Sequence, residues 1–235
     1  MPTLWLTTFT QLGRTAPVHR WILCALLPLC LVSCNTDSYE SGDGKYSYMR
    51  ADFSLVHTVS EQRIDYAITD EGDSLALSPQ GIASWATKAD TLYRALLYYN
   101  KVEGSAEPVL LHRVYSLYPQ ATTRPDTISV DPVHLQSVWV SKNKTFLNLG
   151  LLLKTGKQDG NDHLQSIGMV CDSLLYHADG TQDVYLTLSH SQNGVPEYYS
   201  TRVYASMSLK TYSKGSRIHL LVHTYDGDVI KILVK

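Results

Sequence analysis

Apolar and polar side chains alternate with a period of two over most of this 235-residue chain. Ile64, Tyr66 and Ile68, for example, fall on one face of a predicted strand. Strict alternation over four to eight residues is typical of half-buried β-strands. The sequence contains no apolar stripe of helical spacing longer than two turns, no internal repeat and no low-complexity tract. The pattern therefore predicts an all-β protein.

The first half of the chain predicts five strands, and five strands are enough for a small barrel. A loop or one short helix is expected between the third and fourth strands, at Gly81–Ala89. The predicted strands are 46–57, 63–70, 75–77, 91–102 and 109–118.

The second half predicts seven antiparallel strands, which favours a β-sandwich. Asp179-Gly180, Asn193-Gly194 and Asp226-Gly227 each separate two strand-like runs, and such dipeptides suit the positive φ angles of type I′ hairpin turns. The predicted strands are 135–140, 145–153, 163–171, 183–190, 198–209, 217–225 and 229–234.

A proline- and threonine-containing stretch, Gln120–Pro132, has no apolar period and indicates a domain boundary. We therefore expect a barrel domain at 46–120, a linker at 121–131 and a sandwich domain at 132–235.

The chain begins with features of an export signal. An unbroken apolar run, Trp21–Val32, follows basic residues and is too short to span a bilayer. Leu31-Val32-Ser33-Cys34 then resembles the bacterial lipobox, in which the cysteine is lipidated and the preceding peptide is removed. We expect residues 1–33 to be a type II signal peptide, Cys34 to carry the lipid and residues 34–45 to form a tether. The alternative is an ordinary signal peptide with an incidental cysteine. A separate hypothesis, compatible with the lipobox, is that Met1 is a misassigned start and that a non-AUG codon at Val18 is the true one.

Composition narrows the function classes. Hydrophobic residues make up 44% of the chain and the formal net charge is −2, which predicts a folded globular protein. Lys and Arg do not cluster, so nucleic acid is not an expected partner. Cys24 and Cys30 lie in the predicted signal, so Cys171 is left without an intramolecular disulfide partner and is expected to be a small buried hydrophobe.

The sequence lacks the common catalytic motifs and nucleotide-binding motifs, and we predict no catalytic residue, cofactor or metal. His219 and His223 lie four residues apart on one predicted strand, roughly 13 Å at 3.3 Å per residue. That separation is too large for one zinc ion, so an exposed sheet face is the favoured interpretation. Asp159–Asp162 offers oxygen ligands for calcium, but a polar turn explains the same residues.

Aromatic residues of the predicted barrel are candidates for stacking on sugar or peptide. An OB-type barrel can bind oligosaccharides on one face. The alternative is that the same rings fill the barrel core and its rim. The candidates are Trp85, Tyr93, Tyr99 and Tyr115.

The order of these pieces resembles the NigD-like lipoproteins of Bacteroides-type bacteria. The lipobox and a GDG-containing tether precede Asp131-Pro132-Val133. They are followed by VWVSKNKTFLNLGLLLK from Val138, HLQSIGMVCD from His163 and VYLTLSHSQNG from Val184. The family pattern often has a glycine pair within 140–144, where this chain has Ser-Lys-Asn-Lys. The resemblance implies an N-terminal OB-type barrel and a C-terminal β-sandwich, and it assigns no catalytic residues.

These observations predict a non-enzymatic lipoprotein of the cell envelope that binds a protein, peptide or glycan. Asn35 after the lipidated cysteine is compatible with the outer membrane. The resemblance adds a bacteriocin-related role, in immunity or secretion support, because the family takes its name from a bacteriocin gene cluster. An envelope hydrolase with scattered His, Asp and Ser groups, and a purely structural component, are the alternatives.

Overall fold

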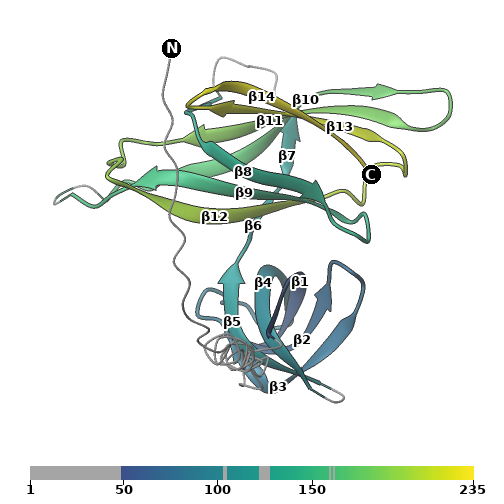
Figure 1. Ribbon diagram of the computed structural model, residues 1–235, viewed down its shortest axis with the longest axis vertical. Helices are drawn as coiled ribbons and strands as arrows, with labels where there is room; N and C mark the ends of the chain where they lie inside the picture. Colours follow the sequence, from purple (N-terminus) through teal and green to yellow (C-terminus); the bar gives the residue numbers. More distant parts are fainter. Residues whose placement is uncertain (1–48, 103–104, 122–127, 159, 161) are drawn as a thin grey trace, which may run out of the picture. The chain divides into compact units, whose positions relative to one another are not determined.

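The computed structural model describes residues 49–102, 105–121, 128–158, 160 and 162–235 (Figure 1). The predicted signal peptide, Cys34 and the tether lie outside the described residues. Within the described part, every regular element is a β-strand, so the all-β prediction is confirmed. No helix in that part is long and apolar enough to cross a bilayer.

The first five strands form a closed barrel in the order β1-β2-β3-β5-β4, with β4 also pairing with β1. This confirms the predicted OB-type barrel. After β3, which takes up Gly81 and Ile82, residues 83–90 form turns and bends without a helix, so the loop alternative holds there. The five strands are β1 (Met49–Ser60), β2 (Arg63–Thr69), β3 (Ser74–Ile82), β4 (Thr91–Val102) and β5 (Ser105–Arg113).

The barrel closes tightly because small residues let its strands approach one another. A Cβ at Gly81 would lie 2.7 Å from Leu111 Cδ1 and 3.4 Å from Ile64 Cβ. Real Cβ atoms do not approach so closely, so a larger residue at this position would force the Leu111 side chain to move; glycine serves close packing here rather than an unusual φ angle. Inward-facing residues such as Val56 and Leu97 are fully buried around this point.

The remaining nine strands form two sheets that pack face to face as the predicted sandwich (Figure 1). One sheet has the order β14-β13-β11-β10-β7 and the other the order β6-β12-β9-β8. The strands are β6 (Tyr115–Leu117), β7 (Pro119–Ala121), β8 (His134–Val140), β9 (Phe146–Thr155), β10 (Ser166–Tyr176), β11 (Gln182–Ser191), β12 (Tyr199–Ser208), β13 (Arg217–Thr224) and β14 (Gly227–Val234).

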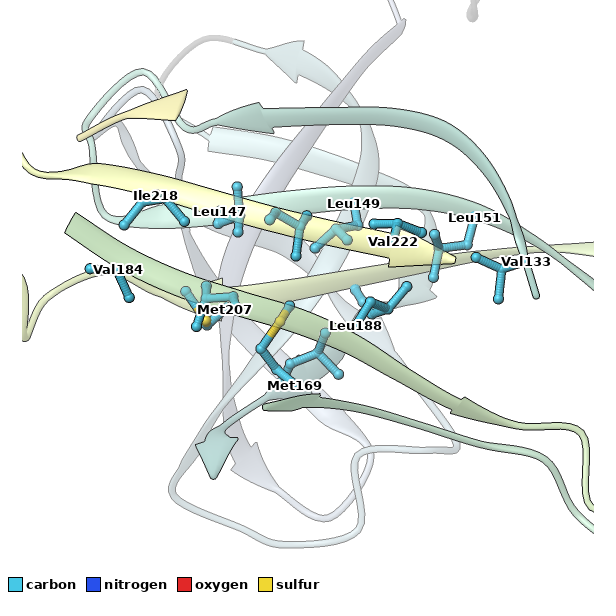
Figure 2. Close-up of a cluster of buried hydrophobic side chains, with 14 of the residues drawn as sticks. Val133, Leu147, Leu149, Leu151, Met169, Val184, Leu188, Met207, Ile218 and Val222 are labelled. Carbon is cyan, nitrogen blue, oxygen red and sulfur yellow. The ribbon is translucent and has the colours of Figure 1, made fainter. Parts of the chain in front are cut away.

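The sandwich core is made by alternate residues of these strands. Leu147, Leu149 and Leu151 of β9 point toward Ile218 and Val222 of β13 from the opposite sheet (Figure 2). All five side chains are fully buried. The period-two pattern of the sequence therefore corresponds to one face of each strand buried between two sheets.

The short strands β6 and β7 carry the chain from one sheet to the other (Figure 1). β6 pairs in parallel with β12, and β7 pairs in parallel with β10. Both strands therefore share sheets with the second half, whereas the sequence prediction assigns residues 46–120 to the barrel. Most of the predicted linker, residues 122–127, lies outside the described residues.

One predicted hairpin is wrong. Asn193 and Gly194 have φ angles of 48° and 72°, as a type I′ turn requires, yet β11 and β12 lie in different sheets. The turn redirects the chain across the sandwich instead of pairing the strands that flank it. In the two turns that do form hairpins, positive φ occurs at Gly180 and Gly227 but not at the aspartate before each glycine. That arrangement fits a turn followed by a glycine in the left-handed region better than type I′.

A buried polar cluster joins barrel and sandwich. Arg94 of β4 is 3% exposed, and its Nη2 donates to Asp70 Oδ2 at 2.6 Å and to Asn148 Oδ1 at 3.1 Å. Its Nε donates to Ser206 Oγ at 3.2 Å, and its guanidinium lies 3.8 Å from the ring centroid of Phe146. Asp70 and Arg94 both belong to the barrel side, while the other three residues lie on β9 and β12. The sandwich therefore covers a buried ion pair of the barrel and hydrogen-bonds to it.

The turn between β8 and β9 adds to this contact. The backbone N–H of Asn143 donates to the carbonyl oxygen of Asp70 at 2.9 Å, and Lys142 Nζ donates to Glu71 at 2.9 Å. Lys144, within the stretch where the family pattern often has glycines, has a φ angle of 59°. A non-glycine residue pays a small strain for that conformation, so the turn keeps the left-handed geometry without the glycine.

Candidate binding cleft

A hollow runs along β12 at the open side of the sandwich. It consists of two adjoining cavities of about 720 and 320 Å³ that share Leu153, Gln165 and Val203. We call this combined hollow the β12 cleft. Its walls come from β9, β12, the start of β10 and the loop between β9 and β10. They include Leu153, Thr155, Gln165, Ile167, Tyr199, Thr201 and Val203, with Tyr115 at one end.

The cleft is a continuation of the sandwich core beyond the point where the opposite sheet covers it. Along β12 the inward-facing residues change from Met207, which is fully buried, through half-buried Val203 to exposed Thr201 and Tyr199. Because strand side chains alternate, all four lie on the same face. The polar and aromatic residues therefore take the inward positions only where the core ends.

The loop that forms the outer wall is held by side-chain hydrogen bonds. Gln165 Nε2 and Gln192 Nε2 both donate to the carbonyl oxygen of Lys154, at 2.5 and 2.9 Å. Asn193 Nδ2 donates to the carbonyl oxygen of Leu164 at 3.1 Å. The Asn193-Gly194 turn thus braces the wall, which indicates a preformed cleft of the kind that small ligands and peptides use.

The chemistry of the lining suits recognition. Leu153, Val203 and Ile167 give an apolar floor, while the hydroxyl groups of Thr155 and Thr201 give polar positions on the walls. Tyr199 is 53% exposed and Tyr115 is 41% exposed. His163, at the loop end, has its Nδ1 2.8 Å from the carbonyl oxygen of Asn193, so that nitrogen acts as a donor to the backbone.

Three of the four aromatic residues singled out from the sequence lie in the barrel, away from this cleft. Tyr99 is 1% exposed, and its hydroxyl donates to Asp52 Oδ2 at 2.9 Å. Burial, followed by that hydrogen bond, raises the pKa of Tyr99 to about 12. Trp85 and Tyr93 pack edge to face, 5.8 Å between ring centroids, against the barrel core. A binding role for these three residues stays a prediction.

Tyr115 is the predicted aromatic residue that the structure places at the cleft. It begins β6, and Arg113 lies over its ring at 4.8 Å from the centroid. Sequence reasoning missed Tyr199, Thr201 and Gln165. The available signal was the loss of apolar residues at inward positions of the predicted strand 198–209, which marks where a core face meets solvent.

The histidines weighed as metal ligands contact carboxylates instead. His219 Nε2 lies 3.3 Å from Asp183 Oδ1, and His223 Nδ1 lies 2.7 Å from Asp228 Oδ1. Arg217 donates to both oxygens of Asp183 at 2.6 and 2.7 Å. These bonds from Arg217, followed by those from the histidines, hold the pKa of Asp183 well below its usual range. Among the described residues, no group of three or more His, Cys, Asp or Glu could hold a metal ion.

The other two sequence candidates have simple outcomes. Cys171 is half-buried and packs against the sandwich core, where burial raises the pKa of its thiol. A raised pKa lowers the thiolate fraction, so this position suits packing rather than nucleophilic chemistry. In the stretch Asp159–Asp162, residues 159 and 161 lie outside the described residues.

Solved structures share this fold. A NigD-like immunity protein from Bacteroides caccae matches with a TM-score of 0.58 and 23% identity, covering 78% of this chain and 90% of that one. A proposed lipoprotein from Bacteroides fragilis matches with a TM-score of 0.55 and 12% identity, covering 79% and 97%. A proposed toxin-related protein from Parabacteroides distasonis matches with a TM-score of 0.57 and 14% identity, covering 80% and 93%. At these identities the likeness concerns the fold alone.

A comparison with proteins of curated function found no similar sequence. The family of the NigD-like C-terminal beta sandwich domain matches residues 116–235, which is half of the chain. The match begins within β6, the first strand that pairs with the sandwich. The resemblance noted from the sequence is therefore confirmed, and this chain belongs to the NigD-like family.

Proposed function

We propose that the protein is a non-enzymatic binding module of the bacterial cell envelope, which holds its ligand in the β12 cleft. The observation that carries the proposal is the change along β12 from fully buried Met207 to exposed Thr201 and Tyr199 on one face. The inward face of β12 becomes accessible to solvent here, beside a loop that hydrogen bonds hold in place. This gives a ligand a concave, partly apolar surface to bind.

The lining favours binding over catalysis. Acyl transfer or hydrolysis needs a nucleophile, a base and donors for the developing charge within one site. The described lining offers the hydroxyl groups of Thr155 and Thr201 and, from the loop at one end, the charged groups of Lys157 and Asp162. The Nδ1 of His163, in the same loop, already faces a backbone carbonyl oxygen. These groups suit hydrogen bonding to a ligand.

We further propose that Cys34 carries the lipid that anchors the module, with residues 34–45 as its tether and the outer membrane as its location. The lipobox and Asn35 support this location. Incorporation of radiolabelled palmitate tests it: label in the wild type and none in Cys34→Ala is expected, and equal labelling would refute the anchor.

A bacteriocin-related role, in immunity or secretion support, is the finer form of this proposal. It rests on family membership and on the name of the Bacteroides caccae neighbour, a NigD-like immunity protein. The partner would then be a protein or peptide of the producing cell.

Crosslinking of the anchored protein in its native envelope, read by mass spectrometry, tests the binding role. Two variants on adjacent residues of β12 form a matched pair. Thr201→Arg places a large charged side chain in the cleft, and Ser200→Arg places the same side chain on the opposite face of the sheet. We expect a reproducible partner that the wild type and Ser200→Arg retain and Thr201→Arg loses. Equal capture by both variants would refute the cleft as the binding site.

A further inference from the structure

One side of β12 is left without a partner over half its length. β6 pairs with β12 at Ala205–Met207 and ends at Tyr115. Before Tyr115 the chain belongs to the barrel, and the N–H of Val114 donates to the carbonyl oxygen of Arg94 at 3.1 Å. In the part of the chain that the structure describes, no strand therefore occupies the position in line with β6 beside residues 199–203. We call this position the open lane.

The direction of the backbone groups along the open lane follows from the pairing on the other side of β12. The N–H of Leu209 donates to the carbonyl oxygen of Thr145 at 2.7 Å, in register with the pairing of β12 and β9. Backbone groups of alternate residues point to opposite sides of a strand. Odd-numbered residues of β12 therefore bond to β9, and the N–H and C=O groups of Ser200 and Arg202 point into the open lane.

The open lane lies above the apolar floor of the β12 cleft. Val203 and Thr201 face inward beside it, and Leu153 and Ile167 complete the floor next to Tyr115. The stretch from Tyr199 to Val203 spans roughly 13 Å at 3.3 Å per residue. Unpaired backbone groups and a hollow that accepts side chains therefore occur together, which is the arrangement of a sheet edge that binds by strand addition.

We propose that the ligand of the β12 cleft is an extended peptide segment of a partner protein, which adds to β12 as a strand in line with β6. This inference rests on the proposed function of the cleft. A glycan could use the hydroxyl groups and rings, but the outward N–H and C=O groups of Ser200 and Arg202 match the two groups that every peptide residue presents. The pairing of β6 with β12 already shows the geometry of such an added strand, over Ala205–Met207.

The lining also predicts which peptide fits. Side chains at alternate positions of the added strand enter the cleft. The position beside Val203 lies over the cavity that Ile167 of the opposite sheet and Tyr115 line, and so favours a large apolar residue. Leu153 lines the same cavity from β9, on the other side of β12. The next inward position, two residues along, lies beside Thr201 and favours a small or hydroxyl-bearing residue. Charged lining residues, Lys157 and Asp162, come from the loop at the far end, so an uncharged centre is expected.

Amide hydrogen exchange with selected peptides tests the inference. The probe is a library of random peptides of about eight residues, screened against residues 34–235 with and without Thr201→Arg. In the free protein, the amides of Ser200 and Arg202 should exchange faster than those of Thr201 and Val203, which bond to β9. A selected peptide should slow exchange at Ser200 and Arg202 and leave the other two unchanged.

Proline at position 200 removes the N–H that a strand would use. The substitution Ser200→Pro is compatible with folding because the lost N–H has no ladder partner in the free protein. Loss of one hydrogen bond and the added ring should weaken peptide binding about tenfold or more, while Ser200→Ala, which keeps the N–H, should bind like the wild type. Thermal unfolding of each variant checks that the fold is retained.

The outcomes separate this inference from the proposed function. A glycan-array ligand that is lost in Thr201→Arg but binds Ser200→Pro normally would leave the cleft as a binding site and overturn the peptide. Concentration-dependent self-association that Ser200→Pro abolishes would make a second copy the occupant and overturn a partner peptide. Failure of the library to yield any peptide sensitive to Thr201→Arg would also overturn it. If Thr201→Arg also leaves capture of the crosslinked envelope partner unchanged, the proposed function of the cleft is refuted together with the peptide.

Discussion

The barrel and the sandwich are built from the same alternation of apolar and polar residues, but they treat the edges of their sheets differently. In the barrel, β4 pairs with β1 from Met49 to Thr58, so the sheet closes on itself. In the sandwich, β6 and β7 have three residues each and cover only part of β12 and β10. Closure removes edges, whereas short edge strands leave backbone groups available for a partner.

Whether a sheet is closed or has a free edge determines whether an aromatic residue on it is buried in a core or exposed to a ligand. Tyr99 of the barrel is 1% exposed because strands surround it, whereas Tyr199 of the sandwich is 53% exposed. Tyr199 lies at the end of β12 that β6 does not reach, since β6 pairs only with Ala205–Met207. Both lie on strands with the same alternation. A ligand site is therefore expected where the inward face of a strand is no longer covered by the opposite sheet. The presence of aromatic residues alone does not locate it.

The largest expected effect tests whether barrel and sandwich behave as one folding unit. Arg94→Ala leaves Asp70 buried without its cation, which should lower the free energy of unfolding by about 4 kcal/mol. Urea unfolding followed by far-UV circular dichroism measures this loss. Lys142→Ala, which removes the exposed pair with Glu71 at the same junction, should change little. Equal effects of the two variants would contradict a buried, stabilising Arg94–Asp70 ion pair where the barrel meets the sandwich.

The next effect separates the barrel ring from the cleft ring. Tyr99→Ala should lower the free energy of unfolding by about 3 kcal/mol, because it leaves a cavity in a closed core. Tyr115→Ala, at the end of the β12 cleft, should cost less than about 1 kcal/mol. Thermal or urea unfolding of both variants measures the comparison. A large loss for Tyr115→Ala would make that ring a core residue and weaken its assignment to a binding site.

Much of the fold could be predicted because alternation is a local property. The residues next to Ile64 and Ile218 in the sequence are enough to show that these side chains lie on the buried face of a strand. The strands and the two architectures can therefore be predicted from the sequence. Strand partners are not local. Asn193-Gly194 has the residues of a hairpin turn, but β11 already pairs with β10 and β13, so β12 joins the other sheet. The local signal was correct about the turn's φ angles and wrong about the hairpin.

The candidate site was harder to predict for a related reason. Tyr199 and Thr201 acquire their place in the cleft from residues far away in sequence, such as Ile167 of β10 and the loop that Asn193 braces. No motif connects these segments. The aromatic candidates of the barrel were chosen by residue type, and residue type does not reveal whether a strand will lie opposite the ring.

A pH effect on the sandwich is expected from Asp183. Its folded pKa is lowered, chiefly by Arg217, so its contribution to stability is fully present above its unfolded pKa of about 3.9. That contribution is lost as the pH falls below this value toward the folded pKa. Between pH 5 and pH 3 the wild type should therefore lose more free energy of unfolding than Asp183→Asn. Arg217→Gln should reduce the same difference, and identical slopes for all three proteins would contradict the assignment.

The smallest expected effect is a pH effect on the barrel. It has the opposite direction to that of Asp183, because stability is lost as the pH rises. Both ring nitrogens of His57 face carboxylates, Nδ1 at 2.7 Å from Asp65 and Nε2 at 3.1 Å from Asp90. These hydrogen bonds, that to Asp65 first, raise the pKa of His57. Its contribution to stability is present below the unfolded pKa of about 6.5 and is lost as the pH rises through the folded pKa.

Titration of the His57 ring by NMR measures this pKa directly, and the midpoint should lie above 6.5. Asp65→Asn should lower the midpoint more than Asp90→Asn, because the Asp90 side chain is 98% exposed and that of Asp65 is 33% exposed. A midpoint at or below 6.5 would contradict the raised pKa. Because Asp183 loses its contribution below about pH 4 and His57 loses its contribution above about pH 6.5, both are present between these values. Acid should therefore lower the stability contribution of Asp183 in the sandwich, while the contribution of His57 in the barrel is retained.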